Sequence, residues 1–115
     1  ATIAAVESAD RAVGEIINEI LARGGTALIT ADHGNAEELL SYAATSYFFT
    51  TTQGAVNTDH SNYPVPLIIA NKSLEGRALS LPKGSLADVA PTTLSLMHRP
   101  LPVEMTGQNL IKTVS

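Results

Sequence analysis

The 115-residue sequence contains no cysteine and no tryptophan, and only 4% of its residues are aromatic. Without cysteine the chain forms neither a disulfide nor a thiolate metal site, so a metal ion would have to be held by imidazole and carboxylate groups. The absence of cysteine is also compatible with a reducing compartment, and we expect a cytoplasmic protein.

Long apolar runs are absent as well. No segment approaches the roughly 18 apolar residues of a transmembrane helix, and the first residues lack the basic-then-apolar layout of a signal peptide, so we expect a soluble chain. The formal net charge of −4 is spread without runs of one sign. This pattern excludes the basic stripe of a nucleic-acid-binding protein and the polybasic patch of a membrane-surface protein. We therefore expect no nucleic-acid or membrane partner.

What is present is a periodic pattern of apolar residues, which make up 44% of the chain. Their spacing over residues 3–21 predicts an amphipathic helix. Gly24 and Gly25 follow it, and a glycine in the left-handed conformation is a common helix end. The apolar run at residues 26–30 is too short for another helix and follows one directly, as a buried parallel strand would.

The rest of the chain predicts shorter elements. A second apolar strand is expected at residues 65–70, with Pro66 at its start or at a sheet edge because proline has no N–H to donate. Asp88 is expected to cap a helix that tolerates Pro91 in its first turn. The remaining expected elements are a helix over residues 36–42 capped by Asn35 with Glu38 in a capping box, a hairpin within residues 46–58 turning at Gln53-Gly54, a short strand at 77–81 and a helical turn at 108–112. Helix followed by strand predicts an α/β fold.

Three side chains of the metal-ligand type flank the two apolar strands. Asp32 and His33 follow the first strand and precede Gly34, and His60 lies shortly before the second strand. In open α/β sheets, ligands gather outside the carboxyl ends of strands, and a carboxylate with a neutral imidazole suits a divalent cation such as Mn²⁺ or Zn²⁺. From spacing alone, the alternatives stay open that Asp32 only turns the chain and that His60 is a solvated loop residue.

Four motifs occur in one order along the chain. They are Ala31-Asp32-His33-Gly34-Asn35-Ala36-Glu37, His60-Ser61-Asn62-Tyr63-Pro64-Val65-Pro66-Leu67, Leu86-Ala87-Asp88-Val89-Ala90-Pro91-Thr92 and Glu104-Met105-Thr106-Gly107. Together they closely resemble the C-terminal part of the cofactor-independent phosphoglycerate mutases, a family of the alkaline-phosphatase-like superfamily. The resemblance covers nearly the whole chain except residues 41–57, which look longer or differently built than usual. It implies a partial alkaline-phosphatase-like sheet with flanking helices, and that residues 1–115 are the C-terminal part of a metal-binding phosphatase-like domain.

The resemblance also implies an activity and a set of ligands. The family interconverts 3-phosphoglycerate and 2-phosphoglycerate, in glycolysis and gluconeogenesis, through a phosphoserine intermediate and two metal ions, commonly Mn²⁺, with Mg²⁺, Co²⁺ or Zn²⁺ as alternatives. Asp32 and His33 match the pair that helps hold the ion beside the nucleophilic serine, and His60 matches a histidine that helps hold the other ion. Ser61 stands where the family usually has threonine. His98 stands where glycine is common, and we leave it out of the site.

Several expectations follow from what these motifs do not include. In the family, the nucleophilic serine and a further Asp and His lie upstream of this segment, so we expect no catalytic residue here and no activity of the segment alone. Three ligands divided between two ions should bind metal weakly, and less well below about pH 7 because a ligating imidazole must be neutral. The expected partners are phosphoglycerate and the remainder of the parent enzyme. The substrate-binding residues stay unassigned, and unpaired strand edges predict that the segment self-associates.

Two rival interpretations remain open. A phosphopentomutase of the same superfamily shares an Asp-His-Gly turn and a later histidine, although the Asn-Ala-Glu after Gly34 and the Glu-Met-Thr-Gly near the C-terminus favour phosphoglycerate mutase. The alternative from a different class is a non-catalytic metal-binding or assembly module derived from such an enzyme.

Overall fold

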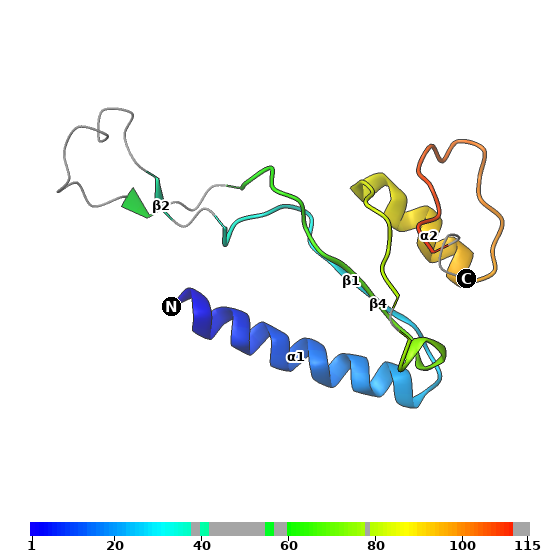
Figure 1. The fold of residues 1–115 in the computed structure, drawn as a ribbon, viewed down its shortest axis with the longest axis horizontal. Coiled ribbons are helices and arrows are strands. Elements are labelled where there is room, and N and C mark those ends of the chain that lie inside the picture. Colours follow the sequence, from blue (N-terminus) through cyan, green and yellow to red (C-terminus); the bar gives the residue numbers. More distant parts are fainter. Residues whose placement is uncertain (38–39, 42–54, 57–59, 78, 112–115) are drawn as a thin grey trace.

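The fold is a long helix beside a narrow β ribbon, with a short helix and the C-terminal segment on the other side of the ribbon in the view of Figure 1. The structure is a computed structural model that describes residues 1–37, 40–41, 55–56, 60–77 and 79–111. No helix in these ranges combines the length and the apolar character that crossing a membrane requires. The α/β class and the partial sheet with helices match the prediction.

Helix α1 spans Thr2–Ala22, as the spacing of apolar residues predicts. Its end is set by glycine, because Gly24 has a φ of 74°, in the left-handed region where a residue without Cβ meets no steric penalty. Gly25 then lies so close to the last turn that an added Cβ would come 2.9 Å from Cγ2 of Ile20. The chain therefore turns sharply out of α1 and into the first strand.

The first strand, β1 (Ala27–Thr30), pairs with β4 (Leu67–Ala70) in an antiparallel sheet, with Ala27 opposite Ala70. Both strands lie where the sequence predicts them, and β4 begins directly after Pro66. The expectation that the first strand belongs to a parallel sheet is wrong for this pair. Parallel neighbours need a crossover connection, usually a helix. Here the segment that leads to β4 instead runs antiparallel to the segment that follows β1, and the two segments pair with each other.

The return path is held by two further pairings that are nested inside the first. Gly34 and Ser61 form an antiparallel bridge, and beyond it β2 (Leu40–Ser41) pairs with β3 (Ala55–Val56). Between the β1–β4 sheet and the bridge, residues 31–33 on one arm face residues 62–66 on the other. The longer arm contains two prolines, which have no N–H to donate to a ladder, so pairing is interrupted there.

Other sequence predictions for this region need correction. The helix expected over residues 36–42 is wrong, because Ala36 and Glu37 lie in a turn and residues 40–41 form β2. The hairpin expected within residues 46–58 lies mostly outside the described residues, including its turn, and β3 pairs with β2. The strand expected at residues 77–81 is also wrong in its described part, because residues 77 and 79–81 form no strand and the Leu79 amide donates to the Arg77 carbonyl instead.

The end of β4 is tied back to the start of β1 by a side chain. Asn71 Nδ2 donates to Thr26 Oγ1 at 2.5 Å, and Asn71 Oδ1 accepts from the Ser73 amide at 2.8 Å. The second bond caps the short 3₁₀ helix η2 (Lys72–Leu74). This one amide therefore joins the open end of the sheet to the connection that follows it.

A 3₁₀ helix, η3 (Leu86–Asp88), runs directly into α2 (Val89–Leu96). Asp88 was expected to cap α2, but its carboxylate reaches backward and accepts from the Ser85 amide at 2.7 Å, so it caps η3. Pro91 is buried in the first turn of α2, as expected. After α2, His98 has a φ of 53°, which places a non-glycine residue in the left-handed region, where glycine is favoured.

The C-terminal segment folds back onto α2 through backbone amides. The Gln108 amide donates to Asp88 Oδ1 at 2.7 Å, and the Leu110 amide donates to Thr92 Oγ1 at 3.0 Å. Gly107 packs on the backbone of Ala87, where an added Cβ would come 2.6 Å from the carbonyl carbon. The third and fourth sequence motifs therefore build one small scaffold, which includes a turn, but no helix, at residues 110–111.

Little apolar surface is enclosed by these elements. Ala27 and Leu110 are the buried hydrophobic side chains among the described residues, and α1 has no buried residue. α1 contacts β1, yet Ile3, Val6 and Ile16 along the helix are 76%, 56% and 60% exposed. Self-association of the chain stays a prediction. Burial of this exposed apolar surface between chains would favour it.

Replacement of Thr92 by valine should destabilise the scaffold. Thr92 is fully buried, and Thr92→Val keeps its shape while removing the acceptor of the Leu110 amide, which should cost about 1–3 kcal/mol. Thr93→Val is the matched control, because Thr93 Oγ1 only donates to the Val89 carbonyl within the same helix. Urea unfolding measures both variants, and equal losses of stability would contradict the assigned role of Thr92.

Acid should weaken the same scaffold through Asp88. The Gln108 amide, followed by the Ser85 amide, holds the pKa of this buried carboxyl below its usual value. A carboxyl with a lowered pKa in the folded state stabilises above its unfolded pKa and loses that contribution as the pH falls through the folded value. Asp88→Asn should therefore be less stable near neutral pH and should show a shallower loss of stability below about pH 4. Urea unfolding as a function of pH measures this, and identical acid slopes would count against it.

Candidate metal centre

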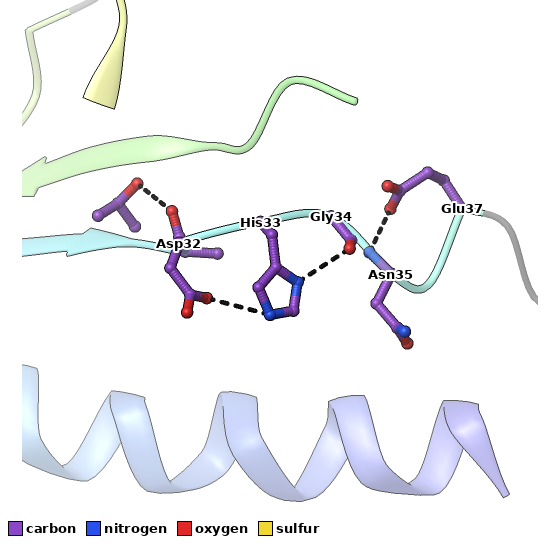
Figure 2. A network of polar contacts seen from close by, with 7 residues as sticks. Asp32, His33, Gly34, Asn35 and Glu37 are labelled. Atoms are coloured by element: carbon purple, nitrogen blue, oxygen red, sulfur yellow. Dashed lines mark hydrogen bonds and ion pairs between the residues drawn. The ribbon is translucent and has the colours of Figure 1, made fainter. Parts of the chain in front are cut away.

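Asp32 and His33 lie just past the end of β1, and their side chains are oriented toward each other (Figure 2). Nδ1 of His33 is 3.0 Å from the carbonyl oxygen of Gly34. A carbonyl can only accept, so Nδ1 carries the proton in this contact, and in the neutral form of the ring the lone pair is on Nε2. Oδ1 of Asp32 is 3.6 Å from that Nε2. Two electron-donating atoms thus lie side by side at the strand end.

The two side chains differ in their exposure. The Asp32 carboxylate is 89% exposed and the His33 ring is 34% exposed. The ring is thus held partly inside the fold by its hydrogen bond, and the carboxylate remains free to adjust to a ligand.

His60 comes from the opposite arm of the ribbon and stacks on His33. The ring centroids are 3.6 Å apart, and the planes are inclined by 11°. The structure therefore brings two of the three predicted ligands into contact and places the third beside one of them. Among the described residues, no group of three or more histidine or carboxylate side chains is close enough to hold a single ion. The three residues form two adjoining pairs, Asp32 with His33 and His33 with His60.

The backbone explains why the two histidines meet. The Ser61 amide donates to the Gly34 carbonyl at 2.8 Å, and the Gly34 amide donates to the Ser61 carbonyl at 3.3 Å. Each histidine immediately precedes one member of this antiparallel pair. The Gly34 carbonyl also accepts from Nδ1 of His33, so one oxygen takes part both in joining the arms and in orienting the ring.

A second connection between the arms was missed by the sequence analysis. Ser61 is 6% exposed, and its hydroxyl donates to Oε1 of Glu37. Oε2 of Glu37 accepts from the Asn35 amide at 3.2 Å, a contact drawn in Figure 2, while Glu38, which was expected to make this contact, lies outside the described residues. The Ser61 hydroxyl, as the largest cause, lowers the pKa of Glu37. The available signal was the hydroxyl that position 61 retains when serine replaces the family's threonine.

Gly34 is required by this second connection. A Cβ added to Gly34 would collide with Oε1 of Glu37 and Oγ of Ser61. Since both atoms lie directly over the Gly34 Cα, any larger residue would have to push the carboxylate or the hydroxyl away. The glycine of the Asp-His-Gly motif therefore serves the junction between the arms.

A cavity of about 650 Å³ adjoins the site. Asp32, His33 and Ser61 contribute to one wall, and Lys83 and Ser85 contribute to another. Its volume lies in the range of small-molecule sites, and its lining includes both a carboxylate residue, Asp32, and a basic residue, Lys83.

Comparison with known proteins places the chain in a family. The family model described as the metalloenzyme superfamily matches residues 1–100. The chain belongs to the metalloenzyme superfamily. Membership implies metal ions, and it agrees with a site built from a carboxylate and imidazoles.

Individual relatives are more specific. The chain is 46% identical over 109 residues to a 2,3-bisphosphoglycerate-independent phosphoglycerate mutase of Clostridium botulinum, 44% identical over 111 residues to one of Desulforudis audaxviator, and 41% identical over 113 residues to one of Rhodopirellula baltica. These matches cover 94%, 96% and 98% of this chain, but each covers 19% of the relative. The resemblance to this family is confirmed, and the chain spans about a fifth of the length of these relatives.

Proposed function

We propose that this chain is part of a cofactor-independent phosphoglycerate mutase, which interconverts 3-phosphoglycerate and 2-phosphoglycerate. Asp32, His33 and His60 are its share of a centre for two metal ions. The observation that carries the proposal is the meeting of His33 and His60 from opposite arms of the ribbon, in a chain 46% identical to such a mutase.

The donor set fits a divalent cation at the Asp32–His33 pair. Two ligand atoms that each lie about 2.0–2.2 Å from one ion are at most about 4.4 Å apart. The 3.6 Å between Oδ1 of Asp32 and Nε2 of His33 is within this limit. The hydrogen bond from Nδ1 to a backbone carbonyl is also the usual arrangement of a ligating histidine, since it leaves the other nitrogen free to bind.

The stacked rings support a centre with two ions rather than one. The lone pair of an imidazole nitrogen lies in the plane of its ring, so the lone pairs of nearly parallel rings do not converge on a shared point. We therefore assign His33 and His60 to neighbouring ions.

The chemistry of such a centre accords with phosphoryl transfer. When bound, divalent ions neutralise phosphoryl oxygens and activate a hydroxyl nucleophile. The proposed ligands of this chain would hold the ions. The nucleophilic serine is assigned, by family resemblance, to a part of the enzyme outside these motifs. A set of imidazole and carboxylate without thiolate suits Mn²⁺, with Mg²⁺, Co²⁺ and Zn²⁺ as alternatives. Lys83 in the adjoining cavity complements an anionic substrate such as phosphoglycerate.

Metal binding by the chain tests the ligand assignment. We expect weak Mn²⁺ binding by calorimetry near pH 7.5, and at least a roughly tenfold loss of affinity in His33→Ala and in His60→Ala. His98→Ala is the matched control, because this histidine lies beyond the end of α2 and is not a proposed ligand. Undetectable binding by the unaltered chain, or an equal loss in the control, would contradict the assignment.

Activity tests the enzyme class. The 115 residues alone should neither turn over 3-phosphoglycerate nor become phosphorylated on serine, because the proposed nucleophile is not among them. In a longer protein that carries this segment, His33→Ala and His60→Ala should lower kcat/KM by two or more orders of magnitude, or at least about 2.7 kcal/mol of transition-state stabilisation. Turnover by the chain alone would contradict the proposal, and activity on a pentose phosphate instead would indicate a phosphopentomutase.

A further inference from the structure

The carboxylate of Glu37 connects the two arms that carry the histidines. One oxygen accepts from the Ser61 hydroxyl on the second arm, and the other accepts from the Asn35 amide on the first. A carboxylate supplies two acceptor oxygens, so a single side chain satisfies both donors. Neither Glu37 nor Ser61 is a proposed metal ligand, and the proposed function leaves this connection without a role.

Backbone pairing between the arms is sparse next to the histidines, although β1–β4 and β2–β3 join the arms on either side of them. Gly34 and Ser61 exchange two hydrogen bonds at a single bridge, and among the described residues no backbone hydrogen bond joins residues 31–33 to residues 62–66. The carboxylate adds a side-chain connection between the arms at Ser61, which is itself a member of the bridge.

Movement at this point would be transmitted to the His33 ring. The Gly34 carbonyl accepts from both the Ser61 amide and Nδ1 of His33. If Ser61 shifts, the carbonyl that orients His33 shifts with it, and His60, next to Ser61, moves relative to its stacking partner. The enclosed position of Gly34 under the carboxylate and the hydroxyl shows how closely this junction is packed.

We propose that Glu37 is a positioning residue that keeps the His33 and His60 rings in register by binding Ser61 and Asn35 at once. This inference rests on the proposed function, because the two rings need a fixed arrangement only if they bind metal ions. It assigns Glu37 no contact with metal or substrate. The carboxylate accepts both hydrogen bonds through separate oxygens, whereas glutamine could reach both partners only if the Ser61 hydroxyl reversed its role and accepted.

The arrangement of the rings is measured without metal, by nuclear Overhauser effects between ring protons of His33 and His60 in the 115-residue chain. We expect them in the unaltered chain and expect at least a fivefold loss of intensity in Glu37→Ala and Ser61→Ala. Ser61→Thr keeps the hydroxyl and should retain them. The cross-strand effects between β1 and β4 serve as the internal reference and should persist in every variant.

Mn²⁺ affinity, measured on the same variants, links the arrangement to binding. Loss of an outer-shell partner lowers metal affinity about 10–100-fold, so Glu37→Ala and Ser61→Ala should each weaken binding about tenfold. Ser61→Ala leaves every charge in place, which separates the positioning effect from the loss of the Glu37 charge. Glu75→Ala removes an exposed carboxylate after η2 and should leave both readouts unchanged.

The outcomes separate this inference from the proposed function. Persistence of the ring effects in Glu37→Ala overturns the inference, as does their loss without any change in Mn²⁺ affinity. Disappearance of the β1–β4 effects in both Glu37→Ala and Ser61→Ala also overturns it, because the carboxylate would then hold the whole ribbon. If the unaltered chain shows the ring effects but binds no Mn²⁺, the metal centre fails while Glu37 still positions the rings.

Discussion

The exchange of two hydrogen bonds between Gly34 and Ser61 is the interaction on which the site depends. The residues it joins are far apart in sequence, and bringing them together costs chain entropy. That cost is shared with the pairings on either side, β1 with β4 and β2 with β3, which enclose the bridge. The bridge in turn sets His33 and His60 side by side, because each histidine precedes one of its members.

The second constraint is the space above Gly34. Its carbonyl accepts two donors, and its missing side chain admits the carboxylate of Glu37 and the hydroxyl of Ser61. The Asp-His-Gly-Asn-Ala-Glu string is therefore a set of mutually dependent parts. Two of its members are candidate ligands, the glycine makes room, and the glutamate reaches the opposite arm. A change at one member is expected to act on the others through contact rather than through charge alone.

The motifs that carry the family resemblance divide into two physical classes. Those around His33 and His60 form the arms of the site. Those around Asp88 and Gly107 form a scaffold, in which a buried carboxylate, a buried threonine hydroxyl and a glycine without room for Cβ hold the C-terminal segment on α2. This scaffold contributes Ser85 and Leu110 to the cavity beside the site, so its stability bears on the shape of the hollow.

The sequence by itself determined the local features. These are the end of α1 at a left-handed glycine, the positions of β1 and β4, and the candidate ligands Asp32, His33 and His60, because apolar periodicity and turn residues act over a few positions. The direction of the strands, the replacement of the expected helix at 36–42 by a turn and β2, and the reach of Glu37 to Ser61 were decided only by the tertiary structure. Each depends on which backbone and side-chain groups meet across a long chain separation, and a single sequence carries no local signal for such pairing.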